Sequence, residues 1–179
     1  HVSFNLVSIA TDAGFASQDF NKWPAFATFW MLFLSCVTCS TGSTGGGIKM
    51  FRTFMLVQQA GREFRRLIHP QMISPLRIGA HVVPNAIVYA ILAFIFVYFV
   101  AVVGITFVLM ISGLELVTAF SAVIAWINNM GPGLNDVGPA ANFAGLTNFQ
   151  KWVGVFTMLA GRLELFTVMV LFTPVFWRK

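Results

Sequence analysis

A stretch without a single charged side chain runs from Ile87 to Ser112, and it limits what this chain can fold into. About 20 apolar residues are enough for a helix to cross the hydrocarbon core of a bilayer. Two further stretches are similar: Pro24–Ile48 has no charged residue, and Trp152–Trp177 contains only Arg162 and Glu164. Only 9% of the chain is charged and 58% is hydrophobic, whereas soluble domains carry about 25% charged residues. The sequence therefore predicts an all-α membrane protein.

Glycines interrupt one of these apolar stretches, at Ser40–Lys49, where the sequence reads STGSTGGGIK. Irregular backbone cannot face lipid, because its N–H and C=O groups would lack hydrogen-bond partners. Such a break is tolerated only where it is buried in protein or lines a water-filled path. The break therefore predicts that something polar crosses the membrane here.

A phosphate-binding loop is the alternative interpretation of the same glycines. That loop needs a lysine directly after its last glycine and then Ser or Thr. Here Ile48 separates Gly47 from Lys49, and Met50 follows. The segment also follows an apolar helix rather than a strand, so we set this alternative aside.

Basic residues are concentrated between the apolar stretches and at the end of the chain, and the net charge is +5. They are Lys49, Arg52, Arg62, Arg65, Arg66, Arg77, Arg178 and Lys179. Next to membrane spans, such clusters mark the cytoplasmic side rather than a nucleic-acid site. We expect a multi-pass membrane protein, no nucleic-acid partner, and a cytoplasmic basic linker (49–77) and C-terminus. The helix at 49–67 could anchor to lipid headgroups or dock a cytosolic regulator.

The chain repeats itself. FNKW at 20–23 matches FQKW at 149–152, and a long apolar stretch follows each. A short apolar segment precedes each, at Phe4–Ala10 and Leu116–Ile127, and ends in polar residues and a glycine. These segments are too short to cross a bilayer, so we predict re-entrant half-helices. The expected architecture is a set of helix–half-helix–helix repeats around a central ion pore.

A half-helix followed by a glycine turn is how cation filters are built, because the turn directs backbone carbonyls at the ion. A glycine after a helix is more often a simple C-cap, but its repetition favours a filter. Side chains of Thr11 and Asn128 could add oxygens or brace the turns. The candidate filter residues are Thr11, Asp12, Ala13, Gly14, Asn128, Asn129, Met130 and Gly131.

Four motifs of this chain are similar to those of a known transporter family. They are ATDAGFAS (10–17), GSTGGGIK (42–49), NNMGPGL (128–134) and GRLELFTVMVLFTPVFWR (161–178). In them the chain resembles the Trk/Ktr/HKT superfamily of potassium transporters, and most of all the membrane pore subunit of bacterial Trk systems. The resemblance implies four repeats around one pore, and a chain that begins at His1 is then expected to be a fragment. It also implies a location in the bacterial inner membrane, potassium as cargo, no cofactor, no other metal and no enzymatic activity. The implied partners are a second copy of the chain, forming a homodimer, and a ring of cytosolic nucleotide-binding regulatory subunits.

On this basis residues 1–68 form most of the third repeat, with a broken second helix at 24–68. Residues 69–83 form a cytoplasmic linker. Residues 84–179 form the fourth repeat, with a first helix at 84–112, a pore half-helix at 115–128, a filter at 128–133 and a second helix at 149–173.

Two barriers below the filter are implied by the resemblance. One is a gate loop made of Gly42, Ser43, Thr44, Gly45, Gly46 and Gly47, with 171–176 as the matching break in the last helix. The other is Arg162. An arginine inside a membrane span is costly and marks a functional site. It lies about 15 Å along the helix from Trp152, too deep to reach the interface, and Glu164 falls on another helix face.

The family's third filter usually reads Thr-Thr-Gly before the aromatic residue, whereas here Ala13 and Gly14 come after Thr11 and an acidic residue, Asp12. Its carboxylate could contact ions, or it could support the turn from behind, which we favour because carbonyls usually line such filters. A sodium-permeable or sodium-coupled transporter of the same fold is therefore the alternative function. A membrane-embedded enzyme or assembly factor is disfavoured, because Arg162 and Glu164 are the main charged residues within the spans.

Overall fold

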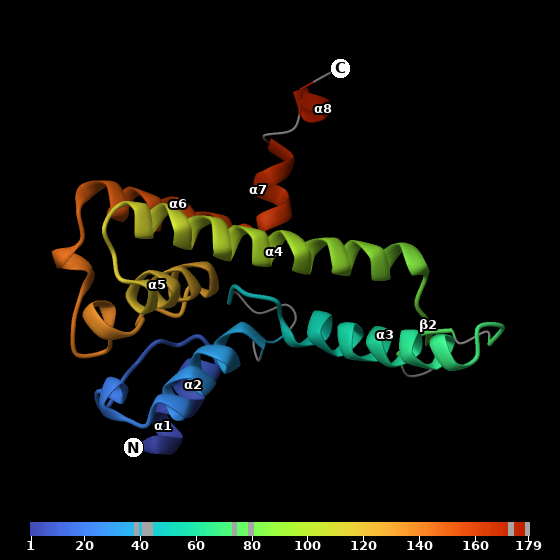
Figure 1. Cartoon of the computed structure of the whole chain (residues 1–179), viewed down its shortest axis with the longest axis horizontal. Coiled ribbons are helices and arrows are strands. Elements are labelled where there is room, and N and C mark those ends of the chain that lie inside the picture. Colours follow the sequence, from blue (N-terminus) through green and yellow to red (C-terminus); the bar gives the residue numbers. More distant parts are fainter. Residues whose placement is uncertain (38–39, 41–44, 73–74, 79–80, 172–173, 178–179) are drawn as a thin grey trace.

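The computed structural model describes residues 1–37, 40, 45–72, 75–78, 81–171 and 174–177. Helices dominate this part of the chain (Figure 1). They are α1 (Val2–Ala10), α2 (Ala25–Val37), α3 (Met50–Ile68), α4 (Asn85–Ile111), α5 (Leu116–Asn128), α6 (Asn148–Arg162), α7 (Leu165–Leu171) and α8 (Pro174–Trp177). Three short 3₁₀ turns, η1 (Phe20–Lys22), η2 (Asn135–Val137) and η3 (Phe143–Gly145), lie in the loops.

Helix α4 is, among the described residues, the one helix long and apolar enough to cross a membrane. It lies within the predicted 84–112. Phe94, Tyr98 and Val102 on one side are buried, whereas Phe96 and Phe107 are 70% and 60% exposed. A helix that is apolar on its exposed side as well as its buried side suits a lipid environment.

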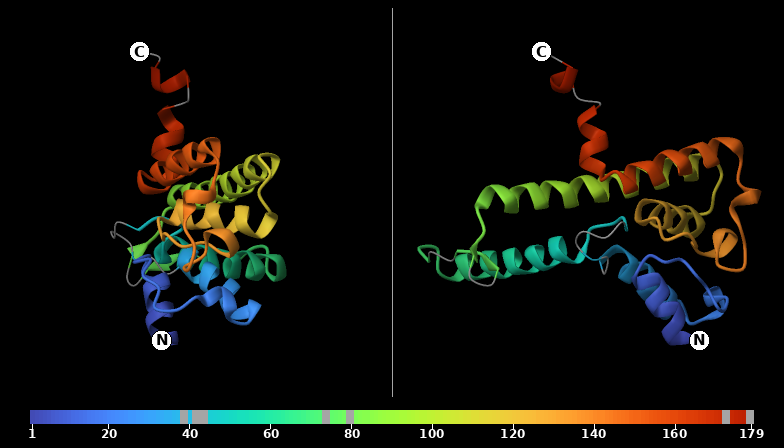
Figure 2. Two further views of the ribbon diagram at one scale, coloured as in Figure 1. Left: turned by 90° about the vertical axis from the view of Figure 1, so that its left-hand side faces the viewer. Right: turned by 180° about the vertical axis from the view of Figure 1, so that it is seen from behind.

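Helix α5 is enclosed by the rest of the chain, and every residue from Thr118 to Asn128 except the half-buried Phe120 is buried. Helices α4 and α6 run along it, and α2 packs against it from the other repeat (Figure 2). With 13 residues, α5 is about 20 Å long, which is too short to span a bilayer. The short helix α1 packs on α2 in the same manner.

The matching tetrapeptides FNKW and FQKW fold differently. In the second copy, Thr147 and Gln150 form a capping box, and the tetrapeptide enters the first turn of α6. In the first copy it forms η1, and Trp23 is extended with ψ 163°. Pro24 explains the difference, because the residue before a proline avoids helical backbone.

The last helix corrects one prediction. A single helix over 149–173 was expected, but α6 ends at Arg162 and α7 begins at Leu165. Glu164 between them has φ 61°, which an α-helix cannot accommodate. Helix α7 runs in a different direction from α6 (Figure 2). It ends at Leu171, where the predicted break begins, and residues 172–173 of that break lie outside the described residues.

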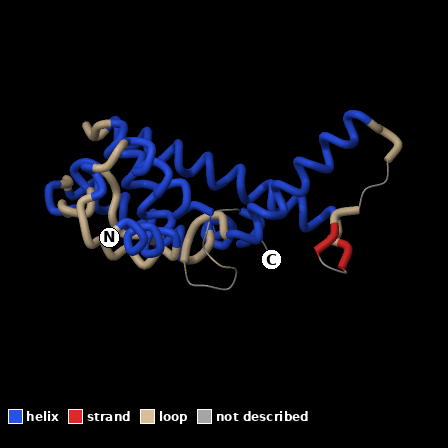
Figure 3. Tube along the Cα trace, turned by 90° about the horizontal axis from the view of Figure 1, so that it is seen from below, coloured by secondary structure: helices blue, strands red, loops and turns tan. Residues whose placement is uncertain are grey.

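The predicted linker at 69–83 contains a small antiparallel hairpin, β1 (Arg77–Ile78) and β2 (His81–Val82), with Arg77 opposite Val82. It lies in the connection between α3 and α4 at one end of the molecule (Figure 3). Helix α3 runs beside the first half of α4 (Figure 1).

Candidate ion-conduction site

The turns that follow α1 and α5 have the same backbone conformation. We call Thr11–Gly14 the first turn and Asn128–Gly131 the second turn. Asp12 and Asn129 have φ of 55° and 58°, and Gly14 and Gly131 have φ of 75° and 102°. Positive φ is uncommon outside glycine. Its recurrence at matching positions shows that the internal sequence repeat is also a structural repeat.

The same pair of backbone hydrogen bonds closes each turn. In the first, Ala13 N–H donates to Ser8 O at 2.8 Å and Asp12 N–H to Ile9 O at 3.1 Å. In the second, Met130 N–H donates to Ala125 O at 2.9 Å and Asn129 N–H to Trp126 O at 3.2 Å. Both half-helices thus end in the same way.

The two turns also touch each other. A Cβ atom on Gly14 would collide with the carbonyl oxygen of Met130. Because Gly14 also has a positive φ, no other L-residue fits this position without strain. Gly14 of the first turn is therefore packed directly against the Met130 carbonyl of the second turn.

The polar side chains of the two turns lie against the protein, although Thr11 does so at an exposed position. The Asn128 amide is fully buried and bonds to Tyr98, Ser35 and Cys36. Thr11 Oγ1 donates to Val7 O of its own helix at 2.8 Å. Both carboxylate oxygens of Asp12 are buried. Of the two roles considered for Thr11 and Asn128, this arrangement favours bracing.

The residues Gly45–Gly47, called here the glycine segment, lie against the end of α5. Gly46 N–H donates to Asn128 O at 3.1 Å. A Cβ atom on Gly46 would collide with the Ile127 carbonyl, and one on Gly47 (φ 77°) would lie 2.9 Å from Asn128 Oδ1. Glycine is therefore needed here for close approach. The other predicted gate residues, Gly42, Ser43 and Thr44, lie outside the described residues.

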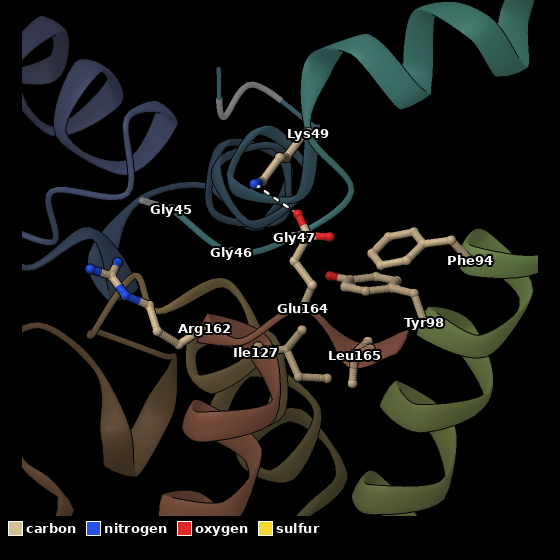
Figure 4. A pocket seen from close by; sticks show the side chains of 11 residues that line it. Gly45, Gly46, Gly47, Lys49, Phe94, Tyr98, Ile127, Arg162, Glu164 and Leu165 are labelled. Atoms are coloured by element: carbon tan, nitrogen blue, oxygen red, sulfur yellow. Dashed lines mark hydrogen bonds and ion pairs between the residues drawn. The ribbon is translucent and has the colours of Figure 1, made fainter. Parts of the chain in front are cut away.

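A cavity of about 160 Å³ lies beneath the second turn, and the glycine segment forms one wall of it (Figure 4). Lys49, Tyr98, Arg162 and Glu164 also line it. The Arg162 side chain points away from that of Glu164, as expected for residues on different faces (Figure 4). Arg162 itself is exposed. The structure thus brings the predicted gate and the predicted barrier residue to one cavity.

Glu164 binds two basic residues at the start of α3. Its Oε1 lies 3.2 Å from Lys49 Nζ, and its Oε2 accepts from Arg52 Nη2 at 3.0 Å. The Arg52 guanidinium stacks 3.9 Å from the centre of the Phe94 ring. The cluster joins α3, α4 and the break before α7.

Sequence reasoning missed this cluster and the partners of Asn128. The sequence shows Glu164 as the one carboxylate within an apolar stretch, but it does not reveal its partners Lys49 and Arg52. Tyr98 could have been found as a hydroxyl within a charge-free span, but its partner could not. Among the described residues, no group of three or more His, Cys, Asp or Glu side chains could hold a metal ion.

Known proteins resemble this chain along its whole length. The family model TrkH, described as a cation transport protein, matches residues 1–179. The Trk system potassium uptake protein TrkH of Halomonas elongata is 43% identical over 183 residues, covering 100% of this chain and 37% of the relative. TrkH of Escherichia coli K12 is 38% identical over 176 residues, covering 98% and 36%.

A solved structure agrees with these relatives. The crystal structure of the potassium transporter TrkH from Vibrio parahaemolyticus matches with a TM-score of 0.90 and 41% identity, covering 98% of this chain and 37% of that one. The chain therefore spans a little over a third of the length of these relatives. The described fold, the repeated turns and the family match together place this chain in the TrkH family of cation transport proteins.

Proposed function

We propose that this chain forms two helix–half-helix–helix repeats of a pore that carries potassium across the bacterial inner membrane. The observation that carries the proposal is the pair of matching turns, which meet where Gly14 faces the Met130 carbonyl. Two such turns supply half of a four-sided carbonyl filter, and the remainder of a longer protein would supply the other half. Its relatives are named potassium uptake proteins.

The filter consists of the two turns, with backbone carbonyls as the ion ligands. Carbonyl dipoles suit a weakly hydrated monovalent cation such as potassium. Asp12 acts from behind the first turn, because both its carboxylate oxygens are buried. Its charge adds negative potential near the ion path without coordinating the ion.

Two barriers lie below the filter. The glycine segment, together with Gly42–Thr44, obstructs the pore and must move for ions to pass. Arg162 places a positive charge at the same cavity and repels cations. A unit charge about 4 Å from another contributes about 1 kcal/mol even in bulk water, and more where water is excluded.

The assembly around this pore follows the family resemblance. The protein is a homodimer, and it binds a ring of cytosolic nucleotide-binding regulatory subunits. Helix α3 carries the exposed Arg65 and Arg66 in its last turn and offers a basic surface for that partner and for lipid headgroups. The basic linker and the C-terminus are cytoplasmic, and the protein is a transporter rather than an enzyme.

The test is rubidium flux into liposomes that contain the full-length protein without its regulator. Deletion of Gly45–Gly47 removes the obstruction and is expected to raise flux. Arg162→Ala is expected to raise flux several-fold, because it removes the repulsive charge. Arg162→Lys keeps the charge and is the matched control. If the deletion and Arg162→Ala both leave flux at the wild-type level, the gate and barrier assignments are wrong.

The sodium alternative is tested in the same liposomes. The ratio of potassium to sodium flux is measured for the wild type and for Asp12→Thr. A ratio well above one supports a potassium pore, and a ratio near one favours the sodium-permeable alternative. A change in the ratio with Asp12→Thr would assign this departure a role in selectivity.

A further inference from the structure

A buried hydrogen-bond network lies behind the second turn. Tyr98 on α4 donates from its hydroxyl to Asn128 Oδ1 at 3.0 Å. Asn128 Nδ2 donates to Ser35 Oγ on α2 at 3.0 Å. The exposed fractions of Tyr98, Asn128 and Ser35 are 2%, 0% and 0%. One amide side chain thus links the first helix of one repeat, its half-helix, and the second helix of the other repeat.

Asn128 is also held through its backbone. Its carbonyl oxygen accepts the hydrogen bond from Gly46 N–H at 3.1 Å. Gly47 packs directly on its side-chain oxygen, since a Cβ atom there would lie 2.9 Å from Oδ1. The glycine segment therefore rests on the residue that begins the second turn.

These contacts make the position of the glycine segment and the state of Asn128 interdependent. A buried polar network is stable when every member is bonded, and losing one partner is costly because the group left behind stays desolvated. When Gly46 moves away, the Asn128 carbonyl loses its donor and becomes available to water or to a cation. Whatever binds that carbonyl must then favour displacement of the segment, because coupling between two sites is reciprocal.

We propose that Asn128 couples the glycine segment to the filter, and that Tyr98 and Ser35 are positioning residues that hold its amide in the closed arrangement. This inference rests on the proposed function. It adds that the obstruction below the filter and the filter itself form one two-state unit. Potassium in the innermost filter site therefore promotes opening, and opening increases the affinity of that site for potassium.

The test uses Tyr98→Phe, which removes one hydroxyl and keeps the ring. Tyr89→Phe is the matched control, because Tyr89 lies on the same helix and its side chain is largely exposed. Rubidium flux through the regulator-free full-length protein is measured in liposomes over a range of potassium concentrations. Tyr98→Phe is expected to raise flux at low potassium by up to about tenfold, as the loss of one buried hydrogen bond implies, and to lower the half-saturating concentration. Tyr89→Phe should change neither.

Two further measurements test the coupling: a second variant, Ser35→Ala, and Tyr98→Phe in a protein that lacks Gly45–Gly47. Ser35→Ala removes the oxygen that accepts from Asn128 Nδ2 at 3.0 Å and leaves it the longer contact to Cys36 Sγ at 3.4 Å, so it should act in the same direction as Tyr98→Phe. The two together should give less than the product of their separate effects, because both act on one residue. In a protein that lacks Gly45–Gly47, Tyr98→Phe should have no further effect on flux, because the element to which it couples is gone.

Three outcomes would overturn the inference. If Tyr98→Phe and Ser35→Ala leave flux and half-saturation unchanged while the glycine deletion raises flux, the coupling is absent and the proposed function stands. If Tyr98→Phe raises flux equally with and without the glycine segment, the network acts on the filter alone. If the glycine deletion itself leaves flux unchanged, the assignment of the glycine segment as a gate is wrong, and the proposed coupling is wrong with it.

Discussion

Lys49 and Glu164 each stand at the point where a helix resumes after a break, and they bind each other. Each stands at a positive φ, 63° and 61°, immediately before the second half of a broken helix. Lys49 Nζ lies 3.2 Å from Glu164 Oε1. The two breaks are thus joined by opposite charges at the cavity that both residues line.

Reversing both charges of the Lys49–Glu164 pair should recover part of the thermal stability that each single reversal removes. Lys49→Glu places two carboxylates together, and Glu164→Lys places three cations together, so each is expected to lower the apparent melting temperature of the full-length protein. The double variant should recover part of the loss. Since the Glu164 side chain is 44% exposed, the coupling energy should be about 0.5–1 kcal/mol.

The control is the Arg66–Glu63 pair on α3, whose side chains are 53% and 49% exposed. Exchanging these charges should change the melting temperature little, because solvent screens such a pair. Equal coupling in the two pairs would contradict a special role for Lys49 and Glu164.

Gly46→Ala should displace the glycine segment without shortening the chain. The new Cβ atom would collide with the Ile127 carbonyl, so the segment could no longer rest on α5. Regulator-free rubidium flux is expected to rise, in the same direction as the glycine deletion. Gly104→Ala on α4 is the control, because nothing in the described part of the chain lies within 4 Å of its Cβ position. A Gly46→Ala protein with wild-type flux would show that the segment is no obstruction.

Asn21 should stabilise the outer loops by binding one backbone position of the other repeat. Its Oδ1 accepts from Asn135 N–H at 3.2 Å, and its Nδ2 donates to Asn135 O at 3.3 Å. Asn21→Ala is expected to cost about 1 kcal/mol of stability, because water can reach the exposed groups that it leaves. Gly138→Ala should cost more, since its Cβ atom would collide with the Asn21 side chain.

The effects of Asn21→Ala and Gly138→Ala on stability should therefore not be additive. In the Asn21→Ala background the colliding side chain is absent, and Gly138→Ala should lower the apparent melting temperature less than it does in the wild type. The same loss in both backgrounds would contradict this contact.

The elements that follow from local pattern could be predicted from the sequence. The charge-free run predicts a helix over 84–112, where the structure has Asn85–Ile111. The short apolar segment before Asn129 predicts a half-helix over 115–128, where the structure has Leu116–Asn128. Both depend on hydrophobicity, length and a terminating glycine turn, which are properties of neighbouring residues.

The break at Leu163 and Glu164 could not be predicted, because neither residue is a helix breaker. It exists where the Glu164 carboxylate meets Lys49 and Arg52, which are far away in sequence. The same is true of Asn128, whose partners Ser35 and Tyr98 come from other helices. The glycine segment is part of the predicted gate loop, but its close approach to Ile127 and Asn128 is visible only in three dimensions.

The filter is the central claim, and Gly14 tests it most directly. Potassium and sodium flux are compared in liposomes that contain the full-length wild type, Gly14→Ala, or the control Gly145→Ala, whose Cβ position has no described atom within 4 Å. We predict that the wild type and the control favour potassium. Gly14→Ala should lose potassium flux by tenfold or more, or lose its preference for potassium, because the first turn can no longer keep its conformation beside Met130. A Gly14→Ala protein with unchanged flux and unchanged selectivity would contradict the assignment of these turns as the ion filter.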